Sequence, residues 1–275
     1  MQLARLPAQA DLAEAYSAAE SLDYIGQELG QRRTAGRLLD RIDRHVRTGA
    51  VFDVGCWVGL LLDEARRRGW RAVGLEPSRF ASEFARGELG LEVQTADLFS
   101  CELEPSSFDA VVLADVLEHL PDPGEALDRI AELVRPGGVL LLTLPDAGSR
   151  LARLMGARWW SVIPTHVHYF TRHSLGKLLG GMGWELLEID TAPKAFTVRY
   201  YMGRLEGYSA RLSSLAIRAT EVCSIADRVW APDFGDRMCA IARVPVTTTP
   251  RLPGGAPRTT PHRFQGCDAP RRSQS

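Results

Sequence analysis

The stretch VFDVGCWVG at residues 51–59 places a glycine turn directly after a short apolar run. Residues 51–54 predict a β-strand and residues 60–68 predict a helix, so the turn connects a strand to a helix. Glycines at 55 and 59 let the backbone approach a ligand closely, and the helix that follows begins with unpaired N–H groups. The stretch predicts a ligand-binding turn, although a G-x-x-x-G spacing alone also fits an ordinary tight turn.

Short apolar runs and amphipathic segments alternate from this turn to residue 189. Strands are predicted at 71–75, 91–95, 108–114, 139–144 and 184–189, and helices at 78–87, 125–134 and 174–181. The run 108–114 is almost continuously apolar, as expected for a strand that is buried on both faces. The alternation predicts βαβ units and a parallel sheet of the α/β class, with ligands beyond the carboxyl ends of the strands.

An acidic residue, Glu76, follows the second predicted strand, 23 positions after Asp53. A carboxylate at this place can accept hydrogen bonds from both ribose hydroxyls of a nucleotide cofactor. The glycine turn lacks the G-x-G-x-x-G pattern of dinucleotide-binding oxidoreductases, because Trp57 stands where that pattern needs its second glycine. An oxidoreductase is therefore disfavoured.

The glycine turn resembles the D-x-G-x-G-x-G motif of class I methyltransferases, which use S-adenosylmethionine as cofactor. The resemblance continues to Ile189 through FDAV at 108–111, DVLEHL at 115–120 and RPGG at 135–138. It implies a Rossmann-like, doubly wound sheet of seven strands, mostly parallel, with an antiparallel last strand and helices on both faces. The residues that the resemblance assigns to the cofactor are Asp53, Gly55, Cys56, Gly59, Glu76, Pro77, Asp97, Leu98, Ala114 and Asp115.

Trp57 departs from the family motif, which usually has glycine at this position. In one hypothesis the indole points away from the cofactor and packs at the entrance of the helix. In the other it crowds the methionine moiety, and the chain is a binding module with the fold of a methyltransferase and impaired cofactor affinity. We expect the first.

The segment PTHVHYFT at 164–171 resembles a branch of the family that acts on small molecules, including sugars, natural products and ubiquinone precursors. The expected acceptor is a hydroxyl oxygen of a sugar, a lipid-linked precursor or a secondary metabolite. Because a hydroxyl must lose its proton, His166 and His168 are candidate general bases. The two side chains share one face if the segment is extended. The alternative is that each imidazole only hydrogen-bonds a loop backbone.

A second group of polar residues follows the fourth predicted strand. Asp115, Glu118 and His119 share one face if this turn is helical, and their side chains are of types that bind divalent cations. A similar E-x-x-E-H segment is associated with metal binding in ubiquinone-biosynthesis O-methyltransferases. These three are weak metal candidates, because most similar segments close the turn structurally. We expect no metal.

Three regions are predicted: an N-terminal helical segment at 1–49, a methyltransferase domain at 50–244 and a disordered, proline-rich, basic tail at 245–275. Within the domain, the core spans 50–190, a helical insertion about 196–230 and the last strand about 236–244. Three tyrosines of the insertion, at 200, 201 and 208, fit either a substrate pocket or the core.

The composition excludes several classes of protein. Lysine and arginine total 33 against 34 aspartates and glutamates, a net charge of −1, which disfavours nucleic acid as a partner. No apolar run has the roughly 18 residues of a membrane span, and residues 1–16 lack the apolar core of a signal peptide. The five cysteines form no C-x-x-C pair, which argues against a zinc ribbon. A cytoplasmic enzyme with a small-molecule acceptor is expected.

Overall fold

The structure, a computed structural model, describes residues 26–244 of the chain. The helices are α3 (Glu28–Ile42), α4 (Leu60–Arg67), α5 (Arg79–Gly87), α6 (Pro123–Leu133), α7 (Arg150–Met155), α8 (Arg172–Gly181), α9 (Val198–Gly203) and α10 (Ala210–Val222). The strands are β1 (Ala50–Val54), β2 (Arg71–Leu75), β3 (Glu92–Gln94), β4 (Phe108–Ala114), β5 (Val134–Pro145), β6 (Glu185–Thr191), β7 (Phe196–Thr197), β8 (Val229–Trp230) and β9 (Arg237–Arg243). Short 3-10 turns are η1 (Leu117–His119), η2 (Gly156–Arg158) and η3 (Arg204–Gly207).

Seven strands form one sheet in the order β3-β2-β1-β4-β5-β9-β6. The pairs among β1 to β5 are parallel, and β9 runs antiparallel between β5 and β6. This confirms the Rossmann-like α/β fold expected from the sequence, with its antiparallel last strand. From β1, the chain adds β2 and β3 on one side and β4 and β5 on the other. The carboxyl ends of β1 and β4 therefore flank the crevice in which ligands bind in such folds.

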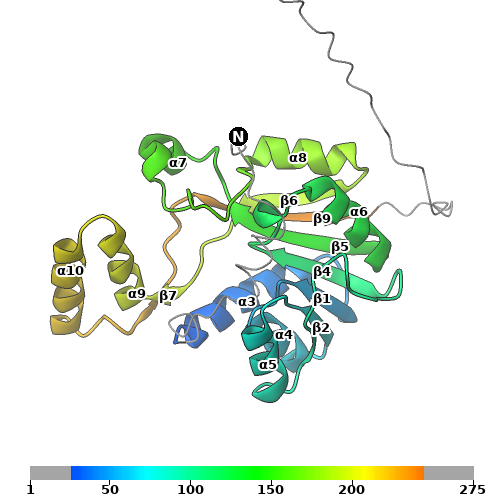
Figure 1. Ribbon diagram of the computed structural model, residues 1–275, viewed down its shortest axis with the longest axis horizontal. Helices are drawn as coiled ribbons and strands as arrows, with labels where there is room; N and C mark the ends of the chain where they lie inside the picture. The colour runs from blue at the N-terminus through cyan, green and yellow to red at the C-terminus, as the bar shows by residue number, and fades with distance from the viewer. Residues whose placement is uncertain (1–25, 245–275) are drawn as a thin grey trace, which may run out of the picture.

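Helices cover both faces of the sheet (Figure 1). One face packs against α3 and α4 through side chains such as Leu39, Val51 and Leu141, and the other packs against α6 and α8 through side chains such as Leu127, Leu140 and Leu175. Alternate residues of the central strands face opposite sides of the sheet, and helices cover both sides. Because both sets of side chains are buried, these strands are apolar at nearly every position.

The predicted element boundaries are mostly confirmed to within one or two residues. The main difference lies at β5, which begins at Val134 and includes Pro136, Gly137 and Gly138 before it reaches the predicted strand. A register shift in the pairing with β4 accommodates this segment. Because a proline and two glycines usually interrupt a strand, the sequence placed the strand start five residues too late.

The insertion after β6 contains more than the predicted helices. The short strands β7 and β8 pair antiparallel and enclose α9, η3 and α10, and these elements form a lobe beside the sheet (Figure 1). Both ends of this excursion meet again at the sheet, where Thr191 pairs with Met238 and the Ala192 N–H donates to the Arg237 carbonyl at 3.2 Å.

The structure describes 26–49 of the predicted N-terminal segment, and α3 lies within this part. The predicted disordered tail, 245–275, lies outside the described residues. Among the helices between residues 26 and 244, none is long and apolar enough to span a membrane.

Candidate functional site

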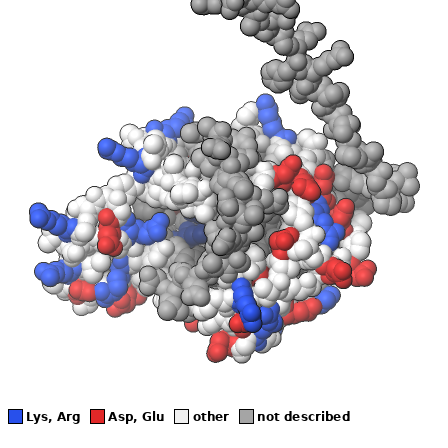
Figure 2. Space-filling model, viewed as in Figure 1, with Lys and Arg blue, Asp and Glu red and all other residues white. Residues whose placement is uncertain are grey.

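A cavity of about 160 Å³ lies at the carboxyl ends of β1 and β4. Its floor includes Asp53, Gly55, Cys56 and Ala114 from these strand ends, and its walls come from α3 and from residues 192–196. Figure 2 shows both basic and acidic side chains on the lobe that carries α9 and α10 and on the opposite side of the visible face. Known ligand pockets measure roughly 300–1,000 Å³, so a nucleotide-sized molecule extends beyond this cavity.

Asp53 is a buried carboxylate that faces the cavity. Asp53 is 3% exposed, and its Oδ1 has no hydrogen-bond partner within residues 26–244. Burial, and then the nearby charge of Glu76, raise the pKa of Asp53 well above its usual value. Such a group destabilises the empty protein when it is ionised, and a cationic ligand in the cavity would offset that effect.

The glycine turn has a left-handed backbone at three of its positions. Gly55 has φ of 71°, Trp57 of 51° and Gly59 of 81°. A Cβ atom at Gly55 would also lie 2.7 Å from a methyl group of Val116, so this position requires glycine for two reasons. The turn is tight enough for Gly55 and Cys56 to donate their N–H groups to the same carbonyl, that of Leu75.

Glu76 orders this turn. Its two carboxylate oxygens accept the N–H groups of Trp57 and Ser78, each at 2.8 Å. Burial raises its pKa, and these two hydrogen bonds act in the opposite direction. Each oxygen retains a second lone pair, so the carboxylate can still accept a further hydrogen bond from a ligand. The sequence indicated a ligand contact at Glu76 but not this second role, because the N–H of a turn residue leaves no mark in the sequence.

Trp57 both packs on α5 and lines the cavity. Its ring lies 6.5 Å from the ring of Phe80, and it joins a small apolar cluster with Val58, Leu60 and Ala81. Its indole Nε1 is buried without a hydrogen-bond partner among the described residues. The packing favours the hypothesis that the side chain fills space at the helix entrance. Because the residue also lines the cavity, the variants below test its effect on cofactor binding.

Replacing Trp57 with glycine is expected to lower the free energy of unfolding by about 1 kcal/mol. Loss of a large buried side chain costs more than this, about 3–5 kcal/mol in a full core. Relief of the left-handed backbone returns roughly 1–2 kcal/mol, and the indole is only half-buried. Thermal melting of the variant measures the effect, with Trp57→Phe as the control that keeps the packing and removes the unpartnered N–H.

The same pair of variants also tests the cofactor site. We expect Trp57→Gly to change the affinity for S-adenosylhomocysteine by less than threefold in calorimetric titration. A gain of tenfold or more would show that the indole obstructs the ligand.

Asp115 does not lie on one face with Glu118 and His119, so the predicted helical turn is wrong at its first residue. Its φ of 61° turns the backbone before η1 begins at Leu117. The carboxylate instead forms ion pairs with Lys194 and Arg237 at the edge of the cavity. Both cations come from segments at least 79 residues away, so local spacing carried no signal for this contact.

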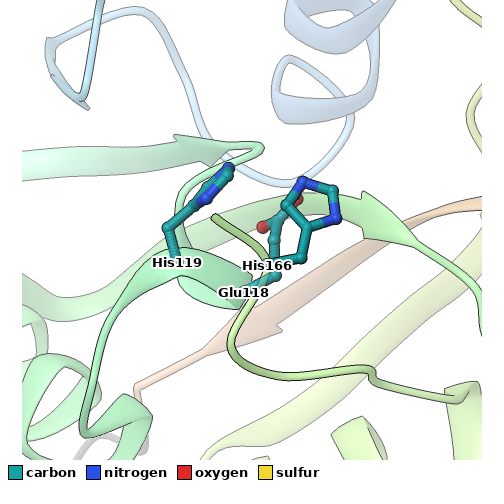
Figure 3. Close-up of side chains that lie close together, drawn as sticks. All are labelled: Glu118, His119 and His166. Carbon is teal, nitrogen blue, oxygen red and sulfur yellow. The ribbon is translucent and has the colours of Figure 1, made fainter. Parts of the chain in front are cut away.

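Glu118 and His119 meet His166 instead (Figure 3). One ligand atom from each of the three residues lies within 4.8 Å of the others. Burial raises the pKa of Glu118 to about 7. Burial, followed by the neighbouring His119, lowers the pKa of His166 to about 4, so its imidazole is neutral at pH 7. The sequence indicated each of these residues but not that they form one cluster.

The second histidine candidate, His168, has a different environment. Its Nε2 lies 3.1 Å from the Pro121 carbonyl, which can only accept a hydrogen bond. This nitrogen therefore carries the proton, and in the neutral ring the lone pair lies on Nδ1. His166 makes the same kind of contact, because its Nδ1 lies 2.8 Å from the Ser161 carbonyl. For His168 the contact matches the alternative interpretation, a histidine that hydrogen-bonds a loop backbone.

Five of the ten predicted cofactor residues do not line the cavity: Glu76, described above, and Gly59, Pro77, Asp97 and Leu98. Asp97 is exposed and accepts the N–H groups of Phe99 and Ser100, Leu98 is in the core, and Pro77 follows Glu76 at the surface. Gly59 begins α4 directly below the turn. Asp97 and Glu76 stand at the ends of neighbouring strands, β3 and β2, on the side to which a ligand larger than the cavity would extend.

The tyrosines of the insertion belong to neither the core nor the cavity lining. Tyr200 and Tyr201 pack with Phe196, and Tyr201 also contacts the rings of Trp230 and Phe234. Tyr208 is half-exposed and donates its hydroxyl to the Arg158 carbonyl at 2.8 Å. Phe196 connects this aromatic group to the cavity, which it lines.

Comparisons with known proteins show the family to which the chain is similar. A family model described as a methyltransferase domain matches residues 27–189. A ubiquinone biosynthesis O-methyltransferase of Alkalilimnicola ehrlichii is 35% identical over 156 residues, which make up 54% of this chain and 58% of that relative. A phosphoethanolamine N-methyltransferase of Haemonchus contortus in complex with S-adenosylmethionine has a TM-score of 0.58 at 17% identity, over 85% of this chain and 60% of that one.

A further structural neighbour is described by a different reaction. The cyclase SpnF has a TM-score of 0.54 at 21% identity and covers 78% of this chain and 81% of its own. Similar folds therefore occur in proteins described by different reactions, and the likeness supports the fold rather than the chemistry. The chain also spans less than two thirds of the length of the Alkalilimnicola relative.

Proposed function

The chain belongs to the methyltransferase domain family, whose class I members use S-adenosylmethionine, and from this premise we propose that it transfers a methyl group from that cofactor to a hydroxyl oxygen of a small molecule. The observation that carries the proposal is Asp53, a buried carboxylate with an unpartnered oxygen at the cavity. S-adenosylmethionine carries a sulfonium and an ammonium group, and a positive charge beside Asp53 compensates the desolvation of the carboxylate.

The proposed cofactor site follows the carboxyl ends of the strands. The methionine moiety occupies the cavity between Asp53, Gly55 and Asp115, and the ribose contacts the remaining lone pairs of Glu76. The adenine lies toward Asp97. The small size of the cavity supports this division, because the nucleoside then extends across the ends of β2 and β3.

The acceptor is proposed to enter between Lys194, Arg237 and the cluster of Glu118, His119 and His166. Methyl transfer requires the acceptor oxygen to stand in line with the S–CH₃ bond, so positioning supplies much of the rate. The oxygen must also lose its proton. His166 suits this side of the site better than His168, because its Nε2 faces Glu118 at 4.0 Å.

A neutral His166 with a low pKa is a weak proton acceptor at pH 7, since general bases work best with a pKa near the working pH. Its lone pair is better suited to hold a hydroxyl or a cation. The similarity to ubiquinone biosynthesis O-methyltransferases supports oxygen as the methylated atom. Sugars, lipid-linked precursors and secondary metabolites with a free hydroxyl are the proposed acceptors.

The experiment that tests the cofactor site is calorimetric titration with S-adenosylhomocysteine. Glu76→Ala is expected to weaken binding by about 1.5–3 kcal/mol, roughly tenfold to more than a hundredfold, because a charged hydrogen-bond acceptor is lost. The variant also loses the two backbone contacts that order the turn. Glu83→Ala, which removes an exposed carboxylate on α5 that pairs with Arg79, is the matched control.

Unchanged affinity in a folded Glu76→Ala protein would rule out the ribose contact. No binding by the wild-type protein would favour the second candidate function, a binding module that retains the fold but not the cofactor. Trp57 at a left-handed motif position is the observation that favours this candidate.

A further inference from the structure

The cluster of Glu118, His119 and His166 contains a buried carboxylate whose hydrogen-bonding capacity is unused. Glu118 is 1% exposed, and neither carboxylate oxygen has a hydrogen-bond partner within residues 26–244. His166 Nε2 lies 4.0 Å from Oε1, which is too long for a hydrogen bond. A buried carboxylate without partners is strongly unfavourable unless a proton or a cation occupies the space beside it.

Each of the two imidazoles has its Nδ1 at a backbone carbonyl. His119 Nδ1 lies 2.8 Å from the Thr165 carbonyl, and His166 Nδ1 lies 2.8 Å from the Ser161 carbonyl. A carbonyl only accepts, so each Nδ1 carries the proton, and in the neutral ring Nε2 carries a lone pair. A backbone carbonyl on the other ring nitrogen is the usual outer contact of histidines that bind metals.

The backbone fixes the two contributing segments to each other. The Glu118 carbonyl accepts the N–H groups of Val167 and His168 at 3.0 and 3.1 Å, so the loop with His166 is attached to the turn with Glu118. The rings of His119 and His166 lie edge to face, with 4.6 Å between their centres. The three side chains therefore converge before any ligand binds (Figure 3).

The ligand set implied by the related E-x-x-E-H segments does not fit this chain. Its first member corresponds to Asp115, which pairs with Lys194 and Arg237 at the cavity edge and is absent from the cluster. We propose that Glu118, His119 and His166 form a site for one divalent transition-metal ion of the zinc type, with His166 as the ligand that replaces Asp115.

The chemistry of the donors selects the class of ion. Two imidazole nitrogens and one carboxylate suit zinc and its transition-metal neighbours, whereas magnesium and calcium prefer all-oxygen sites. Zinc ligands lie about 2.0–2.2 Å from the ion, so two of them are separated by at most roughly 4.4 Å. The separation of 4.0 Å between His166 Nε2 and Glu118 Oε1 is within this limit. All three ligand atoms lie within 4.8 Å of one another, so the side chains would have to move by a few tenths of an ångström, about the excess over 4.4 Å, to hold one ion.

Three protein ligands leave a coordination position open, as in catalytic rather than structural zinc sites. When bound, such an ion favours deprotonation of a hydroxyl placed beside it. This role for the acceptor oxygen rests on the proposed function, whereas binding of the ion does not.

The test is titration of the chelator-treated, metal-free protein with Co²⁺, Zn²⁺ and Mg²⁺. We expect one equivalent of Co²⁺ to give visible absorption bands that Zn²⁺ abolishes by displacement, and at least a hundredfold weaker binding of Mg²⁺. His166→Gln is expected to lower the Zn²⁺ affinity at least a hundredfold and to reduce the rise in melting temperature that Zn²⁺ produces.

Two control variants separate the ligand sets. His168→Gln removes the imidazole two residues away in the same loop, and Asp115→Asn removes the carboxylate that the related segments use; each is expected to keep the Zn²⁺ affinity within threefold. The proposal is overturned if the wild-type protein binds no Zn²⁺, if Mg²⁺ binds as tightly, or if Asp115→Asn rather than His166→Gln loses the ion. Binding of S-adenosylhomocysteine to the metal-free protein reports separately on the proposed function.

Discussion

Asp53→Asn is expected to raise the melting temperature of the cofactor-free protein at neutral pH and to weaken S-adenosylhomocysteine binding by at least a hundredfold. Both effects have one cause, the unpartnered carboxylate at the cavity. Asparagine removes a buried charge and so stabilises the empty fold. The same change removes the negative charge that the cationic cofactor would contact, and loss of one partner of a buried charge pair costs about 3–5 kcal/mol.

The stability effect has a defined dependence on pH. The pKa of Asp53 is higher in the folded protein than in the unfolded chain, so the folded state binds the proton more tightly. The associated stability is fully present below the unfolded pKa, near 3.8, and is lost as the pH rises through the folded value. The advantage of Asp53→Asn over the wild-type protein should therefore grow from about pH 4 upward, and melting curves across this range measure it.

Asp63 provides the opposite control. It is equally buried, but Arg32 and Arg66 donate to it at 2.6 Å each. Burial alone would raise its pKa, and these contacts outweigh burial and lower it. Asp63→Asn should therefore destabilise the protein at neutral pH. If Asp53→Asn also lowered the melting temperature, or left cofactor affinity intact, Asp53 would not be the charged contact of the cofactor.

Gly30→Ala is expected to destabilise the protein by about 1–3 kcal/mol, as overpacking of a close contact does. A Cβ atom at this position of α3 would overlap the carbonyl oxygen of Ala195 and lie 2.8 Å from its carbonyl carbon. The backbone of Phe196, at 3.0 Å, would have to move as well, and Phe196 lines the cavity. We therefore expect weaker cofactor binding together with a lower melting temperature.

Gly36→Ala on the same helix is the matched control. Its nearest neighbour would be the end of the flexible Arg68 side chain at 3.2 Å. Alanine favours helix by about 1 kcal/mol over glycine, so this variant should be as stable as the wild-type protein or more so. Equal melting temperatures for the two variants would show that the contact between α3 and residues 195–196 is not tight.

The fold was predictable because its signals are local. Strands such as Phe108–Ala114 are apolar at every position except Asp109, and the stretch 51–59 joins a strand to a helix through glycines that adopt a left-handed backbone. The start of β5 was missed because Pro136 and the glycines after it normally end a strand. In this sheet the register shift beside β4 accommodates them.

The candidate site was predictable in its residues but not in its contacts. Asp115, Glu118 and His166 were each identified from motifs, yet Asp115 pairs with Lys194, and Glu118 meets a histidine 48 positions later. The left-handed backbone at Asp115 decides this outcome. Non-glycine residues adopt that conformation uncommonly, and helical spacing cannot reveal it.

The excursion between β6 and β9 leaves and re-enters the sheet at directly paired residues, Thr191 and Met238. Lengthening such a loop changes its closure free energy only slowly, by about 0.6 kcal/mol for each doubling. The insertion that contains α9 and α10 can therefore change in length or sequence at a small cost in loop closure. In related proteins, a different insertion between these two paired residues could provide a different acceptor site, while β1, β2 and the glycine turn stay the same.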